Sequence, residues 1–238
     1  MTPSPLVDGD RLVVLARTID AGSDPNACDT LEQEAFRKPR IADGSLSHQI
    51  FRQDSLFKEV EGTVPWTHLE IVAFEQIVPL GAIEAALTPL AGAARTLRTE
   101  LLVATLGSYH GETGTPSQPV PGAVSVEYID VKPDSLKDYR EIMRKHCGPA
   151  AASAITAGKV RDFRALETIT VLQQSDDLPE AWNQLHLFDL GSTHFDDFLV
   201  AFDEGLSAVG PDFQSVFGHL DTIRTMRRWT FSTAVGGR

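Results

Sequence analysis

Two segments of the chain, one in each half, match each other and constrain the fold more than any other feature. They read WTHLEIVAFE at 66–75 and WNQLHLFDL at 182–190. Each begins with tryptophan and then alternates as a strand does, and each is followed by a stretch of helical periodicity, at 79–91 and 192–209. A strand and a helix that recur in this order indicate an internal duplication.

The duplication extends to the segments on either side of the tryptophan strands. A strand rich in β-branched residues is expected at 11–19 and again at 123–131, each followed by a helix. The second of these helices starts with Pro133 and is expected to end at Gly148 and Pro149. Two further strands are expected in each half, at 45–52 and 96–106 in the first and at 163–172 and 222–233 in the second.

Each half therefore reads β-α-β-β-α-β, the ferredoxin-like pattern, and the fold class is α+β. We predict a first half at 8–106, a linker rich in Gly and Pro at 107–122, and a second half at 123–235. A four-stranded sheet with helices on one face needs a partner for its other face, so the halves are expected to pack together, sheet to sheet. This arrangement resembles the dimeric α+β barrel superfamily, here within one chain, and is similar to the EthD group.

The composition of the chain argues against several classes of partner and site. The formal net charge of −12 opposes binding to nucleic acid. Two isolated cysteines, Cys28 and Cys147, fit neither a disulfide framework nor a Cys-rich zinc site. The sequence contains neither the long apolar run of a membrane span nor, at MTPSP, the layout of a secretory signal, so we expect a cytoplasmic protein.

The resemblance implies a ligand pocket between a sheet and its helices, usually for an aromatic or otherwise apolar compound. The superfamily includes haem degraders and peroxidases, cofactor-independent monooxygenases, polyketide cyclases and lactone isomerases, so the fold alone selects no reaction. No catalytic signature of the superfamily matches this sequence residue by residue.

The tryptophan strands carry the first set of candidate catalytic residues. Alternation is expected to place Trp66, His68 and Glu70 on one face in the first half. The matching face in the second half carries Trp182, His186 and Phe188. Histidine beside a carboxylate and an aromatic wall could bind a ring and transfer a proton. The alternative is that this face lies at the contact between the two sheets, with its polar groups hydrogen-bonded there.

The helix that follows Pro133 and the first strand of each half supply the other candidates. Tyr139, Met143 and His146 share a helix face that is expected to look onto the second sheet, although a histidine in a last turn also stabilises the helix dipole. Tyr128 could donate a proton and Arg17 could hold an anion, or both could lie at a sheet edge. Cys147 is expected to be a small buried residue rather than a nucleophile.

We expect no metal and no cofactor, with haem as the second choice. The sequence has no paired-histidine metal motif and no glycine-rich phosphate loop. Haem would need an axial residue, for which His146 and His186 are the candidates.

These observations lead to a cofactor-independent enzyme that acts on a small aromatic or hydrophobic compound by acid/base chemistry, as a lyase, isomerase or cyclase. In this hypothesis His186 and His68 transfer protons, Glu70 orients them, and Tyr128 and His146 are further donors. The predicted substrate contacts are Trp66, Trp182, Arg17, Tyr139, Met143 and Phe188.

Two other hypotheses stay open. One is an oxidative enzyme, either a cofactor-free or a haem-dependent monooxygenase; the other is a non-catalytic binding protein for an apolar metabolite. The second half is favoured as the working half, and further homo-oligomerisation is left open.

Overall fold

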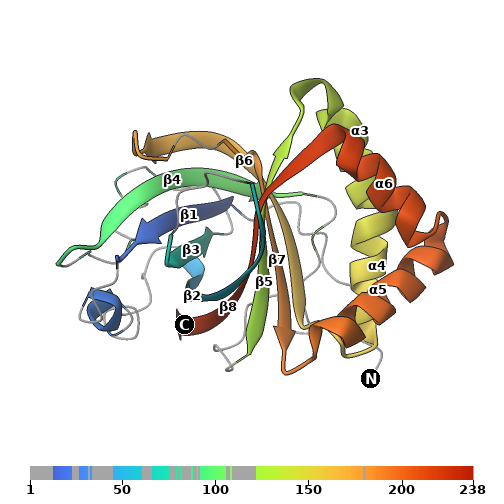
Figure 1. Ribbon diagram of the computed structural model, residues 1–238, viewed down its shortest axis with the longest axis horizontal. Helices are drawn as coiled ribbons and strands as arrows, with labels where there is room; N and C mark the ends of the chain where they lie inside the picture. The colour runs from blue at the N-terminus through green and yellow to red at the C-terminus, as the bar shows by residue number, and fades with distance from the viewer. Residues whose placement is uncertain are drawn as a thin grey trace.

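The computed structural model describes residues 13–22, 27–31, 45–60, 66–74, 92–105, 122–178 and 181–237, together with a few single positions between them. Eight strands of these residues form one closed antiparallel barrel in the order β1-β3-β2-β8-β5-β7-β6-β4 (Figure 1). The strands of the first half are β1 (Val13–Asp20), β2 (Ser45–Glu59), β3 (His68–Phe74) and β4 (Arg95–Ala104). Those of the second half are β5 (Ala123–Val131), β6 (Asp162–Gln174), β7 (Gln184–Gly191) and β8 (Arg224–Gly237).

The strand order confirms the predicted α+β class and the ferredoxin-like sheet of each half. Within each half the first strand lies between the fourth and the third, and the second strand lies at one edge. The barrel closes because β2 pairs with β8 and β4 pairs with β6 across the halves. The two sheets are therefore joined edge to edge by hydrogen bonds rather than only packed face to face.

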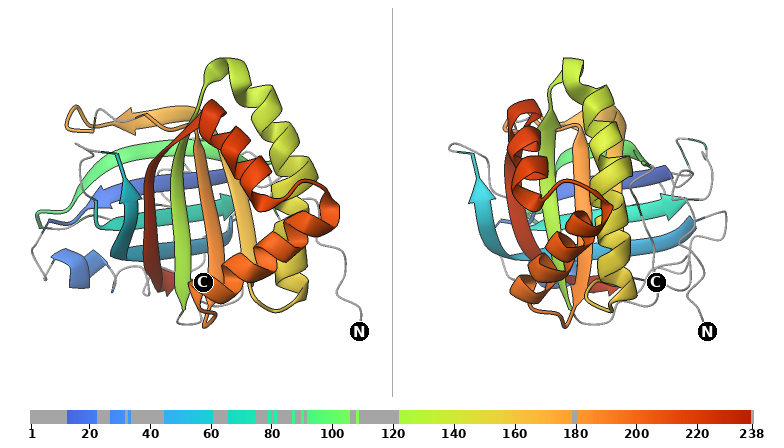
Figure 2. Two further views of the ribbon diagram at one scale, coloured as in Figure 1. Left: turned by 45° about the vertical axis from the view of Figure 1, so that its right-hand side comes forward. Right: turned by 90° about the vertical axis from the view of Figure 1, so that its right-hand side faces the viewer.

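Helices cover the outer face of the second-half sheet (Figure 2). They are α3 (Leu136–Ile142), a π-helical turn (Met143–Cys147), α4 (Gly148–Thr156), α5 (Phe195–Val209) and α6 (Phe213–Ile223). The predicted helix end at Gly148 and Pro149 is wrong, because Pro149 lies in the first turn of α4, where no backbone N–H donor is needed. Helix α6 was not predicted; the side chain of Asp212 caps its start by accepting a hydrogen bond from the Ser215 backbone at 2.8 Å.

The buried apolar residues form two large clusters, one inside the barrel and one on the helix-covered face of the second-half sheet. The inner cluster contains Trp66, Tyr128 and Trp182 together with Leu and Val residues of several strands. The outer cluster lies between the second-half sheet and its helices and contains Tyr139 and Phe188. Alternate residues of one strand belong to opposite clusters, as the pleat of a strand requires.

Some sequence-based expectations fall on residues outside the described ranges. These residues include most of the helix expected at 79–91 and nearly all of the linker expected at 107–122. The boundaries 8–106, 107–122 and 123–235 stay predictions. Within the described residues, no helix combines the length and apolar character that crossing a membrane requires.

Candidate functional site

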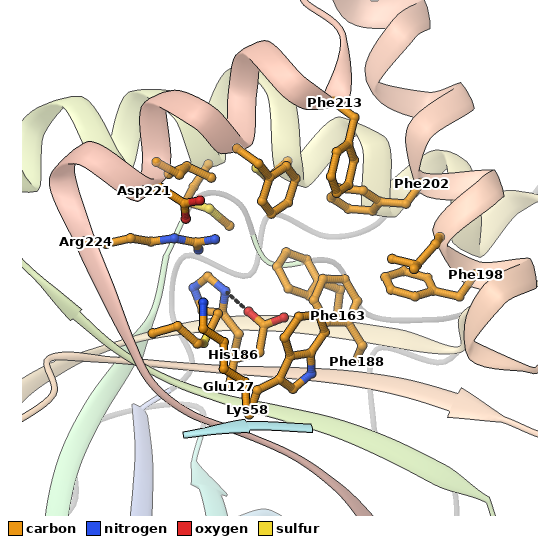
Figure 3. Close-up of a pocket in the computed structure, with 17 residues that line it drawn as sticks. Lys58, Glu127, Phe163, His186, Phe188, Phe198, Phe202, Phe213, Asp221 and Arg224 are labelled. Atoms are coloured by element: carbon orange, nitrogen blue, oxygen red, sulfur yellow. Dashed lines mark ion pairs between the residues drawn. The ribbon is translucent and has the colours of Figure 1, made fainter. Parts of the chain in front are cut away.

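A cavity of about 270 Å³ lies between the second-half sheet, the π-helical turn, and helices α5 and α6 (Figure 3). Its wall is mainly aromatic and aliphatic, as in sites for apolar ligands. The lining residues are Lys58, Glu127, Met143, Cys147, Phe163, His186, Phe188, Phe198, Leu199, Phe202, Phe213, Phe217, Leu220, Asp221, Arg224, Met226 and Trp229.

His186 is the central polar residue of the cavity. Its Nε2 lies 3.0 Å from the hydroxyl oxygen of Tyr139, and its Nδ1 lies 3.6 Å from Oε2 of Glu127. The sheet register sets this pair, because Glu127 on β5 is directly opposite His186 on β7. A carboxylate that faces Nδ1 favours a proton on that nitrogen, which leaves the Nε2 lone pair to accept a hydrogen bond or a proton.

Burial controls the charge of these groups. His186 is 2% exposed, and desolvation lowers its pKa, with a partial opposing effect from Glu127. Burial raises the pKa of the Tyr139 hydroxyl, so this group stays neutral and available as a donor. The cavity therefore holds a neutral imidazole, the form that can act as a general base.

The lowered pKa of His186 predicts a loss of stability in mild acid. The unfolded chain takes up a proton as the pH falls below the ordinary value of 6.5, while the native imidazole stays neutral. The free energy of unfolding should therefore decline from that pH down to the lowered native pKa and be unaffected by this group below it. Urea unfolding at several pH values would measure this decline, and it should be smaller in His186→Gln. An equal decline in both proteins would contradict the assignment.

Cationic side chains approach the cavity from both halves of the chain. Arg224, the first residue of β8, lies near His186, and the charge of its guanidinium group contributes to lowering the His186 pKa. Lys58 comes from β2 of the first half, next to a register irregularity in the pairing of β2 with β8. Such irregularities often redirect side chains near functional sites. The barrel closure thus brings a first-half residue to a second-half cavity.

The structure brings together part of the predicted set of site residues. Met143, His186 and Phe188 line the cavity, and Tyr139 is bonded to His186 directly behind its wall. Cys147 also lines it, and burial raises the pKa of its thiol to about 12, in agreement with the expected inert residue.

Trp66, Trp182 and Tyr128 point into the barrel instead, so the expectation that each tryptophan shares a face with the histidine of its strand is wrong. Strands β3 and β7 begin two residues after the tryptophans, and period-two alternation holds only within a strand. The Trp66 indole donates a hydrogen bond to the Tyr128 hydroxyl at 3.1 Å, and the Tyr128 ring contacts both tryptophans edge-on.

The first-half candidates form a separate buried cluster. Glu70 pairs with Arg17 and with His48, whose Nε2 lies 2.7 Å from Glu70 Oε1. By sheet register, Glu70 and Arg17 occupy the positions that His186 and Glu127 occupy in the second half. His68 lies on the same strand, 2.9 Å from the Thr67 hydroxyl.

His146 lies away from the cavity, against Gly210 at the end of α5. The sequence analysis missed Glu127, Arg224 and Lys58. A signal existed for Glu127, because it is the one carboxylate among the buried positions of a mainly apolar strand. The other two depend on helix α6 and on the pairing of β2 with β8.

The described lining does not fit a haem. Its one imidazole, that of His186, has a hydrogen-bonded Nε2 and an Nδ1 directed at Glu127, so neither ring nitrogen is held open towards the cavity, as the permanent axial ligand of a haem must be. Cys147 keeps its proton and is therefore not a thiolate ligand. A methionine binds haem iron together with a histidine, so Met143 and Met226 do not replace the missing histidine ligand. In the described part of the chain, no group of three or more His, Cys, Asp or Glu is arranged for a metal ion. The absence of a cofactor stays a prediction.

Solved structures similar to this chain share the whole architecture. An anthrone oxidase-like protein has a TM-score of 0.58 and 10% identity, with 98% of this chain and 96% of the other covered. The fold is that of a dimeric α+β barrel. A candidate monooxygenase from Lactobacillus acidophilus NCFM has a TM-score of 0.50 and 10% identity, with 95% and 97% covered. A chlorite dismutase variant from Candidatus Nitrospira defluvii has a TM-score of 0.50 and 12% identity, with 96% and 92% covered.

These identities are too low to transfer more than the fold. No family model matches the sequence, and no curated protein matches it. The finer similarity to the EthD group stays a prediction.

Proposed function

We propose that the chain is a cofactor-independent oxygenase that oxidises a polycyclic aromatic compound with molecular oxygen. The observation that carries the proposal is a neutral, buried His186 between Glu127 and Tyr139 at one end of an aromatic cavity. A neutral imidazole held by a carboxylate is a general base, and the surrounding phenylalanines suit a flat apolar substrate.

The proposed chemistry needs only the substrate and oxygen. When the substrate displaces the Tyr139 hydroxyl from Nε2 of His186, this nitrogen takes a proton from an activated ring CH₂ group next to a carbonyl system, which leaves a delocalised carbanion. Oxygen accepts electrons from this carbanion, a C–O bond forms, and a proton gives a hydroperoxide. Loss of water from the hydroperoxide yields a ketone, so that one CH₂ group and one O₂ become one C=O group and one H₂O. Anthrone, which becomes anthraquinone in this way, is the model substrate.

The similar structures support oxidation over the lyase, isomerase or cyclase hypothesis. An anthrone oxidase-like protein and a candidate monooxygenase share this fold over nearly the full chain. The same histidine could also serve a lyase or an isomerase, and a binding protein would need no proton transfer. Only an oxygenase needs molecular oxygen for turnover, so the dependence of the rate on oxygen distinguishes it from a lyase, an isomerase or a binding protein.

The test is turnover of anthrone by the purified protein without added flavin, haem or metal, in the presence of a chelator. We expect consumption of one O₂ per anthraquinone formed, and incorporation of one ¹⁸O atom from ¹⁸O₂ into the new carbonyl. Anthrone also oxidises spontaneously, so the rate without protein is subtracted. Transformation of an aromatic substrate at the same rate without oxygen would refute oxygenation and favour a lyase or isomerase. Binding without turnover would favour the non-catalytic protein.

A further inference from the structure

Arg224 is a buried cation that lacks an acidic partner within the described residues. Its side chain is 8% exposed, and its Nε is buried without a hydrogen-bond partner. Buried arginines are normally paired with an acid. Two other buried arginines follow this rule, since Arg98 pairs with Glu100 and Arg164 pairs with Asp162.

The groups around Arg224 do not neutralise it. The charge of Arg224 acts on the Tyr139 hydroxyl, but burial raises the pKa of this phenol and keeps it neutral. Glu127 faces His186, and Asp221, which lines the same cavity, is exposed and forms no ion pair with Arg224 among the described contacts. The Phe217 ring lies 5.5 Å from the guanidinium carbon.

A structural role at the end of α6 is the competing explanation. Arg224 is the residue after the last turn of α6, where a cation interacts favourably with the helix dipole. That interaction is equally available to an exposed side chain, whereas Arg224 is buried at the cavity wall. The burial of a charge without a counter-charge points instead to a ligand that supplies one.

The cavity has a polar end and an aromatic end. Arg224 lies above His186 in Figure 3, and the rings of Phe198 and Phe202 lie on the other side of the cavity. Arg224 and His186 both line the cavity, and the charge of Arg224 acts on His186, so the two groups lie at the same end of it. A proton removed by His186 would leave its negative charge near Arg224.

We propose that the site binds its aromatic ligand as an anion, with an ionised oxygen at the ring edge held by Arg224. This inference rests on the proposed function and deepens it. It names the substrate class as polycyclic aromatic compounds with a phenolate, enolate or carboxylate oxygen. The site prefers the anionic to the neutral form of the ligand because a guanidinium group in a desolvated site forms charge-assisted hydrogen bonds with an ionised oxygen.

The test uses the dye 2-hydroxyanthraquinone, whose phenol and phenolate absorb at different wavelengths, and its neutral analogue 2-methoxyanthraquinone. Quenching of tryptophan fluorescence measures binding of both, because Trp229 lines the cavity. We expect the bound hydroxy dye to show the phenolate band at a pH at which the free dye is protonated. In Arg224→Met, this band should disappear, and the affinity for the hydroxy dye should fall roughly 10- to 100-fold. The affinity for the methoxy dye should change by less than about threefold.

Matched variants separate binding from folding. Arg224→Lys should keep part of the preference for the anion, and Lys58→Met, which removes an exposed charge from the same cavity, should reduce it far less than Arg224→Met. Ligand-free Arg224→Met should resist urea as well as the parent protein or better, because it loses an unpaired buried charge. A marked loss of stability together with an unchanged dye preference would assign Arg224 to the structure and overturn the proposal.

A carboxylate probe identifies the source of the anionic oxygen. Tighter binding of anthraquinone-2-carboxylate than of the hydroxy dye assigns a carboxylate ligand, and the reverse assigns a phenolate or enolate. Equal binding of hydroxy and methoxy dyes by the parent protein, with no phenolate band, overturns the inference while oxygen-dependent turnover can persist. Loss of the oxygen dependence with an intact anion preference would instead overturn the proposed oxygenation alone.

Discussion

Replacing His186 by glutamine is expected to lower kcat/KM for the oxidation of anthrone by about 100- to 10,000-fold, the range for removal of a general base. Glutamine fills a similar volume and can still hydrogen-bond to Tyr139, but it cannot take up a proton at neutral pH. Initial rates of oxygen consumption, corrected for spontaneous oxidation, would measure the effect. Circular dichroism and urea unfolding of the same sample would show whether the fold is kept.

The matched control is the same substitution at His68, which lies on the corresponding strand of the first half. His68→Gln should keep most of the activity, because the residue is outside the cavity lining. Glu127→Gln should give an intermediate loss, since it removes the charge that faces Nδ1 while the imidazole remains. A folded His186→Gln protein with full activity would exclude His186 as the base.

Replacing Glu100 by glutamine is expected to lower the free energy of unfolding by about 3–5 kcal/mol, the usual effect of removing one partner from a buried ion pair. Glu100 is 1% exposed inside the barrel. It accepts hydrogen bonds from Arg98 at 2.8 Å, from the Trp182 indole at 2.7 Å and from Thr168 at 2.7 Å. The variant leaves the guanidinium charge of Arg98 buried without its counter-charge.

Urea unfolding would measure this effect, with Glu141→Gln as the control. Glu141 at the exposed end of α3 forms ion pairs with Arg144 and Lys145 of the next turn, and such exposed pairs contribute little to stability. The double variant Arg98→Met with Glu100→Leu should be more stable than Glu100→Gln, because it removes both charges. Equal losses in Glu100→Gln and Glu141→Gln would contradict a structural role for the inner pair.

The strand pattern of the fold was predictable because it depends on local alternation. The predicted strand at 123–131 coincides with β5, and the tryptophan segments contain β3 and all but the last residue of β7. The ends of β2 and β6 were predicted too early. Residues 54–59 of β2 and 169–174 of β6 are exposed, so they show no buried alternation, and pairing with the opposite half determines where these strands end.

The candidate site was predictable only where one element carries the information. His186, Phe188 and Met143 lie on faces that periodicity identifies, and they do line the cavity. Arg224 was missed because no helix was predicted at 213–223 and the residue fell in the strand expected at 222–233. Trp66 and Trp182 were misplaced because each lies two residues before its strand begins, where the alternation of a regular strand does not apply.

The covalent connection between the halves has an evolutionary consequence. In a barrel assembled from two identical chains, every mutation appears twice, so neither sheet can change its chemistry without changing the other. In this chain, Glu70 and Arg17 form a buried ion pair at the positions where His186 and Glu127 face a cavity. Gene fusion thus allows a division of labour, in which one copy is selected for integrity and the other is free to acquire new substrates.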